Sequence, residues 1–220
     1  MRYGESAFDI LYLLFAVISG CIILRRAQNK TEKLTGSAVL ILGLGDAFHL
    51  VPRVLYYFVS ADFTAALGIG KFITSLTMTV FYVLLFYVWR KTYDEDKSRS
   101  KELFVWCCAI TRFALCLFPQ NGWLSNHNDM SWGIIRNIPF VLLGALIIWL
   151  FYQKRKDGAP FQPGWIYILF SFLFYIPVAV GAGAVPMLGM LMLPKTVCYI
   201  LLIAVFLRQS SSGKKPACSE

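Results

Sequence analysis

The segment TGSAVLILGLGDAFHLVPRVLYYFV, residues 35–59, is apolar over most of its length. About 20 such residues are enough for a helix to cross the roughly 30 Å hydrocarbon core of a bilayer, so the segment predicts a membrane span. It nevertheless contains Asp46, His49 and Arg53. Ionisable side chains are costly inside a membrane and usually mark an ion pair, a ligand site or a proton-transfer group. The segment therefore predicts a transmembrane helix with a polar site within it.

Similar apolar runs recur along the chain, which has 220 residues, 58% of them hydrophobic and only 15% charged. This composition is too apolar for a soluble domain of such length. Seven runs are long enough to be membrane spans, at about 8–25, 36–59, 64–89, 102–118, 132–152, 163–185 and 187–207. We therefore expect an all-α integral membrane protein, with a single seven-transmembrane-helix bundle over residues 1–207 and a disordered cytoplasmic tail over residues 208–220.

Basic residues are distributed unevenly among the connections between these runs. Most of the 21 Lys and Arg lie in segments 25–33, 90–101, 154–156 and 208–215, which are every second connection and the C-terminus. Because positively charged connections stay in the cytoplasm, the N-terminus is predicted outside and the C-terminus inside, in a multi-pass protein of the cell membrane. The net charge of +9 then reflects topology and attraction to anionic lipids, and nucleic acid is not an expected partner.

Cysteine and histidine give no sign of a metal centre. The six cysteines form no C-x-x-C pair with zinc-ligand spacing, and most of them lie within predicted helices. The two histidines are His49, in a span, and His127, in an external connection, with no apparent third ligand. We therefore expect no metal and no other cofactor.

Five further basic residues fall inside predicted spans: Arg53, Lys71, Arg112, Arg136 and Lys195. With the predicted orientation, all of them lie at a similar depth in the outer half of the bilayer. Either each side chain reaches the outer headgroups separately, or the side chains converge on one polar cavity. Such a cavity would bind a membrane lipid or another anionic small molecule, and phosphate suits it because guanidinium groups bind phosphate through paired hydrogen bonds. Tyr199 shares a helical face with Lys195 and belongs to the same candidate binding set.

Asp46 is the only acid predicted close to the middle of the bilayer. It shares one helical face with His49 and Arg53, because these residues follow it at positions i+3 and i+7. Its carboxylate either pairs with Arg53, Lys71 or Lys195 to stabilise the bundle, or acts as a general acid or base. His49 is likewise either a proton-transfer partner or a hydrogen-bonding residue of the core.

Six positions in this span form a recognisable pattern: Gly45, Asp46, Ala47, Leu50, Pro52 and Arg53. Together with the next helix, LGIGKFITSLTMTVFY, this pattern resembles two helices of the YhhN family of membrane proteins, which includes lysoplasmalogenases. The likeness covers about residues 40–86. It implies cleavage of the vinyl ether bond of a lysoplasmalogen to a fatty aldehyde and a glycerophospho-base. It also implies that Asp46 is the acid/base group and that a cationic pocket holds the lipid phosphate.

The chain departs from that family in the number of its acids. The family typically has eight helices and a second aspartate in a late Ser-Asp pair, whereas the last three predicted helices here contain no acid. The resemblance therefore requires His49, Asp9 or Glu5 as the second catalytic group.

Two functions are compatible with these patterns. The first is a lipid hydrolase with Asp46 and His49 as catalytic groups and the intramembrane cations as the phosphate site. The second is a small transporter or receptor-like protein that binds an anionic ligand with the same residues. Prolines that allow helices to bend favour the second function: Pro139, Pro177, Pro186 and Pro194. An enzyme alters its lipid in detergent, whereas a transporter needs a sealed membrane. A structural subunit whose charges pair internally is a third possibility, and it predicts that no ligand stabilises the protein.

Overall fold

The computed structural model of the chain describes residues 2–59, 61–95, 99–125, 130–156, 160–181 and 185–212. His127 and the part of the predicted tail beyond residue 212 lie outside the described residues. Within them the secondary structure is helical, without strands, as the sequence predicts. Six helices are long and apolar enough to cross a membrane, which supports the predicted class of membrane protein.

The described elements are α1 (Arg2–Arg26), α2 (Lys30–Phe58), α3 (Thr64–Thr92), α4 (Arg99–Leu117), η1 (Pro119–Asn121), α5 (Met130–Gln153), α6 (Gly164–Gly181), η2 (Pro186–Leu191) and α7 (Met192–Ser212). Each predicted run corresponds to one α-helix. The largest difference is at the last run, where residues predicted to start the span form the 3-10 helix η2 instead and α7 begins only at Met192. Pro186 opens η2, where its missing N–H costs no hydrogen bond.

Helix α2 begins with reciprocal capping. The Asn29 side chain accepts the backbone N–H of Glu32 at 2.8 Å, and the Glu32 carboxylate accepts the N–H of Gln28 at 2.7 Å. These bonds satisfy N–H groups that have no partner within the helix. Pro52 lies inside α2 and removes one backbone donor from the half of the helix that carries the polar stripe.

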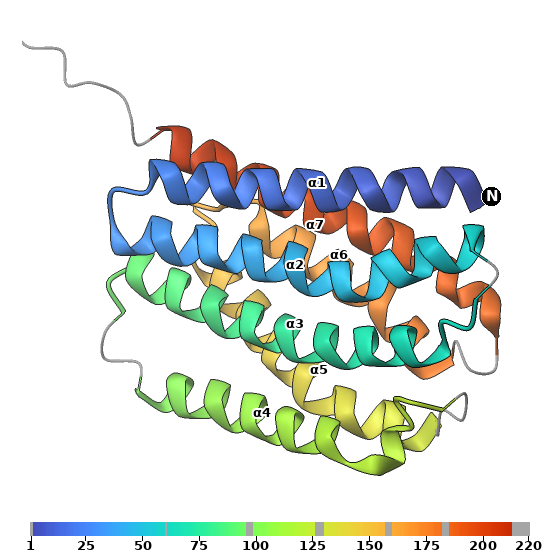
Figure 1. Cartoon of the computed structure of the whole chain (residues 1–220). Helices are drawn as coiled ribbons and strands as arrows, with labels where there is room; N and C mark the ends of the chain where they lie inside the picture. The colour runs from blue at the N-terminus through green and yellow to red at the C-terminus, as the bar shows by residue number, and fades with distance from the viewer. Residues whose placement is uncertain are drawn as a thin grey trace, which may run out of the picture.

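The helices form a ring with one helix outside it. Consecutive helices pack against each other, α7 returns to pack against α1, and α3 contacts α5 directly. Helices α1, α2, α3, α5, α6 and α7 therefore close the ring, while α4 lies against α3 and α5 at the edge of the bundle (Figure 1). The six helices of the ring are the candidate membrane spans among the described residues, and the span of α7 includes most of η2. Helix α4 is not among these candidates. Charged residues within α4, among them Arg99, Lys101 and Arg112, lower its hydropathy.

Aromatic side chains fill the interior of the ring. Tyr82 and Trp89 of α3 are fully buried, and the Tyr82 ring meets Phe140 of α5 edge-on with centroids 5.2 Å apart. The Trp89 Nε1–H donates to the Leu150 carbonyl oxygen at 3.0 Å, so its polar group is satisfied. Close packing and interhelical hydrogen bonds are what hold helices together in lipid, and this cluster supplies both.

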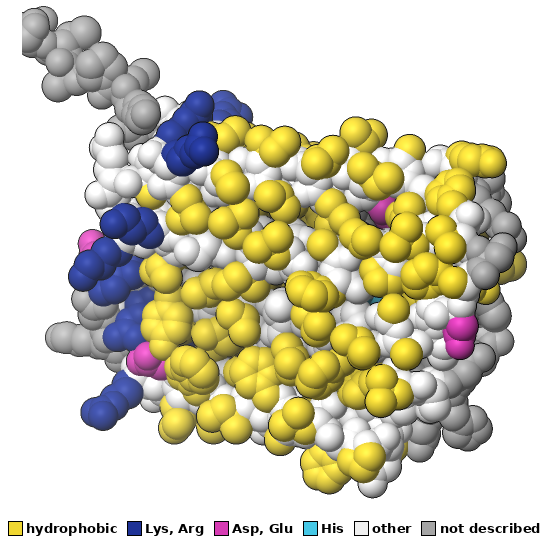
Figure 2. All heavy atoms as spheres, viewed as in Figure 1, with side chains coloured by type: hydrophobic (Ala, Val, Ile, Leu, Met, Phe, Trp, Pro, Cys, Tyr) yellow, Lys and Arg dark blue, Asp and Glu magenta, His cyan; other side chains and the backbone are white. Residues whose placement is uncertain are grey.

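Lys and Arg side chains gather at one end of the face shown in Figure 2, where α1 joins α2 and α3 joins α4, and apolar side chains cover much of its middle. We call this the basic end, and the end that carries the N-terminus the N-terminal end. At the basic end Arg90 of α3 pairs with Glu102 of α4 at 2.7 Å, and Glu95, which follows α3, pairs with Lys154, which follows α5, at 2.9 Å. A hydrogen bond from the Lys154 ammonium lowers the pKa of the Glu95 carboxyl below its ordinary value, which favours the charged carboxylate of this pair.

Gly70 marks a close approach of α3 to α2. A methyl group at this position would collide with the Phe48 carbonyl oxygen and come within 2.7 Å of the His49 Cα. Because both obstacles are backbone atoms, we expect Gly70→Ala to push the helices apart and to destabilise the protein by about 1–3 kcal/mol. Thermal unfolding in detergent measures this effect. Gly133→Ala on α5 is the control, because nothing lies within 4 Å of its added methyl group. Equal melting temperatures for the two variants would contradict the close contact.

Candidate functional site

Asp46, His49 and Arg53 of α2 line a cavity of about 60 Å³ between α1, α2, α3 and α7. Leu50 completes this face of α2. The remaining walls are formed by Glu5, Asp9, Thr74, Gly189, Met192, Leu193, Lys195, Thr196 and Tyr199. A cavity of this size, lined by polar groups, can hold a few water molecules.

Helix α1 contributes a polar stripe that faces α2. Glu5 and Tyr12 are separated by two helical turns and lie on the same face. The Tyr12 hydroxyl donates to Asp46 Oδ2 at 2.7 Å. Glu5 forms an ion pair with Arg53 and also accepts a longer hydrogen bond, at 3.3 Å, from the Tyr57 hydroxyl. Two polar contacts therefore join α1 to α2, one at Asp46 and one nearer the N-terminal end.

Asp9 lies between these two contacts along α1. Its side chain is 4% exposed, and its Oδ2 has no hydrogen-bond partner among the described residues. Arg53, Glu5 and Asp46 are the charged groups that interact with it. A buried carboxylate oxygen without a donor is costly. Asp9 therefore requires a proton, a water molecule or a ligand at this position.

Lys195 of α7 is the second strongly basic side chain in the lining. Its ammonium lies 4.7 Å from the centre of the Tyr175 ring and 5.5 Å from that of Tyr199. Asp46 is the acid with which Lys195 interacts electrostatically. The lining thus has more carboxyl groups than strongly basic groups, since Glu5, Asp9 and Asp46 face only Arg53 and Lys195.

His49 faces the same cavity. Its Nδ1 is buried and has no hydrogen-bond partner in the described part of the chain, while the imidazole also interacts with the backbone of Leu67 at the start of α3. Lys71, Arg53 and Lys195 are the charged groups around it. A buried ring nitrogen without a partner is costly, so this atom calls for a water molecule or a ligand beside it.

Lys71 and Arg136 lie away from this lining. Lys71 is exposed. Arg136 donates to the Asn121 side-chain oxygen at 2.8 Å, and its guanidinium lies 4.4 Å from the centre of the Trp123 ring. Arg136 therefore holds the connection between α4 and α5.

Arg112 on α4 also lies outside the lining but is buried, with only 2% of its surface exposed. Its guanidinium carbon lies 3.8 Å from the centre of the Phe140 ring. Nε and Nη1 of Arg112 have no hydrogen-bond partner among the described residues. The guanidinium also interacts electrostatically with Lys195. Of the five cations predicted in spans, the structure thus brings Arg53 and Lys195 to one cavity and leaves Arg112 buried behind the aromatic core.

One residue that binds Asp46 has no counterpart in the sequence prediction. Tyr12 binds Asp46 directly, and a signal for it exists, because Glu5, Asp9 and Tyr12 form a polar stripe at helical spacing in an apolar span. Thr74 donates its hydroxyl to the Gly45 carbonyl oxygen at 3.0 Å, which fixes α3 against the backbone next to Asp46. Thr74 belongs to a polar face of this helix, with Lys71 and Ser75, that the sequence also predicts to face protein or water, but its particular partner on α2 depends on how the helices pack.

Comparison with protein-family models, with curated proteins and with solved structures found no match for this chain. Within the described residues there is also no group of three or more His, Cys, Asp or Glu placed to hold a metal ion. The side chains that line the cavity are therefore the basis for assigning a function.

Proposed function

We propose that the protein is a membrane-embedded lipid hydrolase of the lysoplasmalogenase type, with Asp46 as its acid/base group. One observation carries the proposal: Asp46 is held by Tyr12 at 2.7 Å beside a second buried acid, Asp9, whose Oδ2 lacks a partner in the described residues. Neighbouring carboxyl groups with different surroundings are typical of acid/base catalysis. The resemblance over residues 40–86 supplies the reaction.

Vinyl ether hydrolysis needs a proton donor and a proton acceptor. In the proposed reaction the Asp46 carboxylic acid gives its proton to the outer vinyl carbon, leaving a cation shared by the adjacent carbon and the ether oxygen. Water adds to this carbon and loses its proton to the Asp9 carboxylate. The resulting hemiacetal separates into a fatty aldehyde and the glycerophospho-alcohol, and the proton returns to Asp46 through the cavity. The Tyr12 hydroxyl and the Lys195 ammonium stabilise the carboxylate that Asp46 becomes.

Arg53 and Lys195 are the cations proposed to bind the lipid phosphate, because both line the cavity. Arg53 is paired with Glu5, so a phosphate would share or replace this pair. The cavity of about 60 Å³ is too small for a headgroup, and we propose that the lipid enters as the helices separate. If the cavity widened as the lipid entered, Arg112 would be the next buried cation that the phosphate could contact.

We further propose that all seven α-helices cross the cell membrane, with the N-terminus outside. The accumulation of Lys and Arg at the basic end supports this orientation (Figure 2). In this arrangement α4 directs Arg112 toward the ring, where Phe140 covers its guanidinium. The exposed side chains of Leu103, Ile110 and Leu117 on α4 would then face lipid.

Cysteine labelling tests this topology. In a background with the native cysteines replaced by serine, Asp62→Cys in the α2–α3 connection should react with a membrane-impermeant maleimide in intact cells. Glu95→Cys at the basic end should react only after the cells are permeabilised. Labelling of Glu95→Cys in intact cells, with Asp62→Cys protected, would reverse the orientation.

Transport of an anionic ligand is the second candidate function. The observation that favours it is a second cavity, of about 450 Å³, at the opposite, basic end of the ring. Alternating access opens one site in turn to either side of the membrane, and cavities at both ends of the bundle offer an approach to such a site from each side. Gradient-dependent uptake of phosphate into sealed proteoliposomes would support this candidate.

Incubation of the purified protein with a lysoplasmalogen in detergent separates the two functions. A hydrolase releases fatty aldehyde without any gradient, and mass spectrometry detects it. Uptake into sealed proteoliposomes without aldehyde release in detergent would assign the cavity to transport instead.

A further inference from the structure

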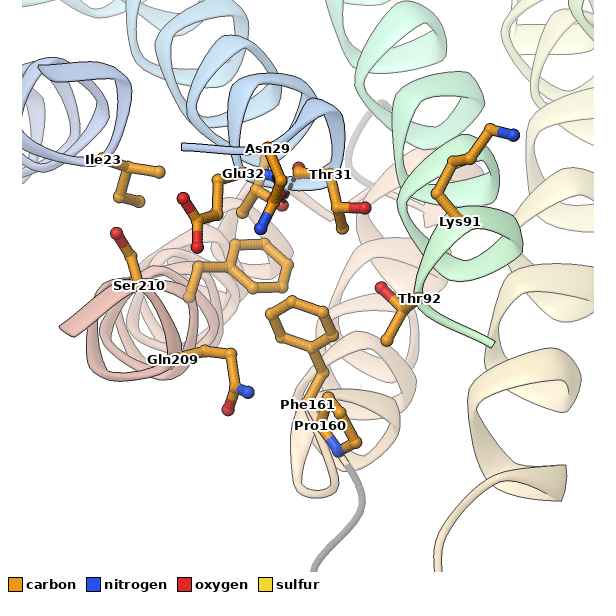
Figure 3. Close-up of a pocket in the computed structure, with 12 residues that line it drawn as sticks. Ile23, Asn29, Thr31, Glu32, Lys91, Thr92, Pro160, Phe161, Gln209 and Ser210 are labelled. Atoms are coloured by element: carbon orange, nitrogen blue, oxygen red, sulfur yellow. Dashed lines mark hydrogen bonds between the residues drawn. The ribbon is translucent and has the colours of Figure 1, made fainter. Parts of the chain in front are cut away.

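The cavity at the basic end has no part in the proposed hydrolysis. Its walls come from α1, α2, α3 and α7 and from Pro160 and Phe161, which precede α6 (Figure 3). Its volume of about 450 Å³ lies within the range of small-molecule sites, roughly 300–1,000 Å³. The chemistry of its walls therefore indicates what it can bind.

Ser210 of α7 is the first sign of a ligand site. Its side chain lines the cavity and is 6% exposed, yet its hydroxyl oxygen has no hydrogen-bond partner among the described residues. Buried hydroxyl groups in folded proteins normally have a partner. Because the hydroxyl of Ser210 lines the cavity, a molecule in the cavity is a natural partner for it.

The charges around the cavity are arranged asymmetrically. Of the described lining residues, Glu32 is the acid and Lys91 the cation. Glu32 uses Oε2 to accept the Gln28 N–H at 2.7 Å, and no donor within the described part of the chain binds its Oε1. In Figure 3 the Lys91 ammonium points away from the centre of the cavity, whereas Glu32 and Asn29 lie beside it. The interior is therefore acidic and the rim basic.

The floor of the cavity is aromatic. Phe161 and Phe206 meet edge to face, with ring centroids 5.3 Å apart. Phe161 has a φ of 59°, a backbone conformation that a bulky residue rarely adopts. The Tyr93 hydroxyl anchors this segment by donating to the Pro160 carbonyl oxygen at 2.6 Å. The Phe161 ring thus lines the cavity although its backbone conformation is strained.

We propose that this cavity binds a phosphoethanolamine group, with the ammonium between Glu32 and the phenyl rings and the phosphate at the rim near Lys91. A carboxylate, neutral oxygens and ring faces together recognise an ammonium. The surrounding Lys and Arg repel a simple cation, but they attract a zwitterion whose phosphate faces outward. The group belongs either to phosphatidylethanolamine of the adjacent leaflet or to a soluble phosphoethanolamine. This site is independent of the Asp46 site and of its proposed reaction.

The test is a titration of the full-length protein in detergent with soluble phosphoethanolamine, followed by its melting temperature. We expect a saturable rise that glycerol phosphate, which lacks the ammonium, does not produce. Glu32→Gln should weaken the apparent affinity at least 10-fold, and Ser210→Ala should weaken it several-fold. Both variants should fold, because glutamine can still accept the Gln28 N–H and Ser210 has no hydrogen bond to lose among the described residues. Glu95→Gln removes a carboxylate from the same end but outside the cavity lining, and should bind normally.

Reconstitution distinguishes the two sources of the group. The same measurement is made in phosphatidylglycerol bilayers with and without phosphatidylethanolamine. Stabilisation by the lipid, with or without a response to the soluble compound, supports the site, provided that Glu32→Gln abolishes it. An equal response to glycerol phosphate, an unchanged affinity in folded Glu32→Gln, or no response to either form overturns the proposal.

Discussion

Replacing Asp46 with asparagine is expected to lower vinyl ether hydrolysis at least about 100-fold. An amide cannot give a proton to the vinyl carbon, but its oxygen can still accept the Tyr12 O–H that binds Asp46 at 2.7 Å. The fold should therefore survive, with a melting temperature within a few degrees of the wild type. Aldehyde release and melting temperature, measured on the same preparation, separate loss of chemistry from loss of structure.

The matched control for this variant is Asp62→Asn. Asp62 is an exposed acid in the α2–α3 connection whose side chain accepts the Thr64 N–H at 2.9 Å, and asparagine can keep this bond as well. The control should retain full activity. A wild-type rate in folded Asp46→Asn would remove Asp46 from catalysis and leave it as a structural partner of Tyr12.

Replacing Lys195 with methionine is expected to lower kcat/KM about 100-fold, a loss of about 2.7 kcal/mol in transition-state binding. Lys195 is the lining cation that interacts with Asp46, and its ammonium is proposed to bind the lipid phosphate. Loss of phosphate binding raises KM, whereas loss of support for the ionised Asp46 lowers kcat. Steady-state kinetics on lysoplasmalogens therefore show how the effect divides between the two roles.

Two further variants test whether the effect of Lys195 depends on its positive charge and on its position in the cavity. Lys195→Arg keeps the positive charge and should recover part of the activity. Lys154→Met removes a lysine that pairs with Glu95 at the basic end, and should leave kinetics unchanged. If Lys195→Met were folded and as active as the wild type, the phosphate site would have to lie elsewhere, and Arg112 would be the next buried cation to test.

The helical class and the polar face of α2 could be predicted because both follow from periodicity. Apolar runs set the helices, and the spacing of Asp46, His49 and Arg53 places them on one face, which the structure directs at one cavity. The sequence also predicts a similar depth for the five cations, and this remains a prediction. Depth alone does not fix the direction in which a side chain points, so Lys71 is exposed and Arg136 binds Asn121.

The partners of these residues could not be predicted, because they depend on how the helices pack. Arg53 pairs with Glu5 of α1 instead of Asp46, and Asp46 takes the Tyr12 hydroxyl. Both contacts require α1 and α2 to lie in one particular register, which close approaches such as Gly43 against Ala16 set. The position of α4 outside the ring depends in the same way on the direct contact between α3 and α5.

The central claim is that the Asp46 cavity hydrolyses a vinyl ether, and a pair of matched lipids tests it most directly. Purified protein is incubated with a lysoplasmalogen and, separately, with the lysophospholipid whose chain is joined by a saturated ether, and the products are identified by mass spectrometry. The account predicts fatty aldehyde from the vinyl ether and none from the saturated ether, since only the vinyl carbon can accept the Asp46 proton. Absence of aldehyde from the vinyl ether with folded protein would contradict it.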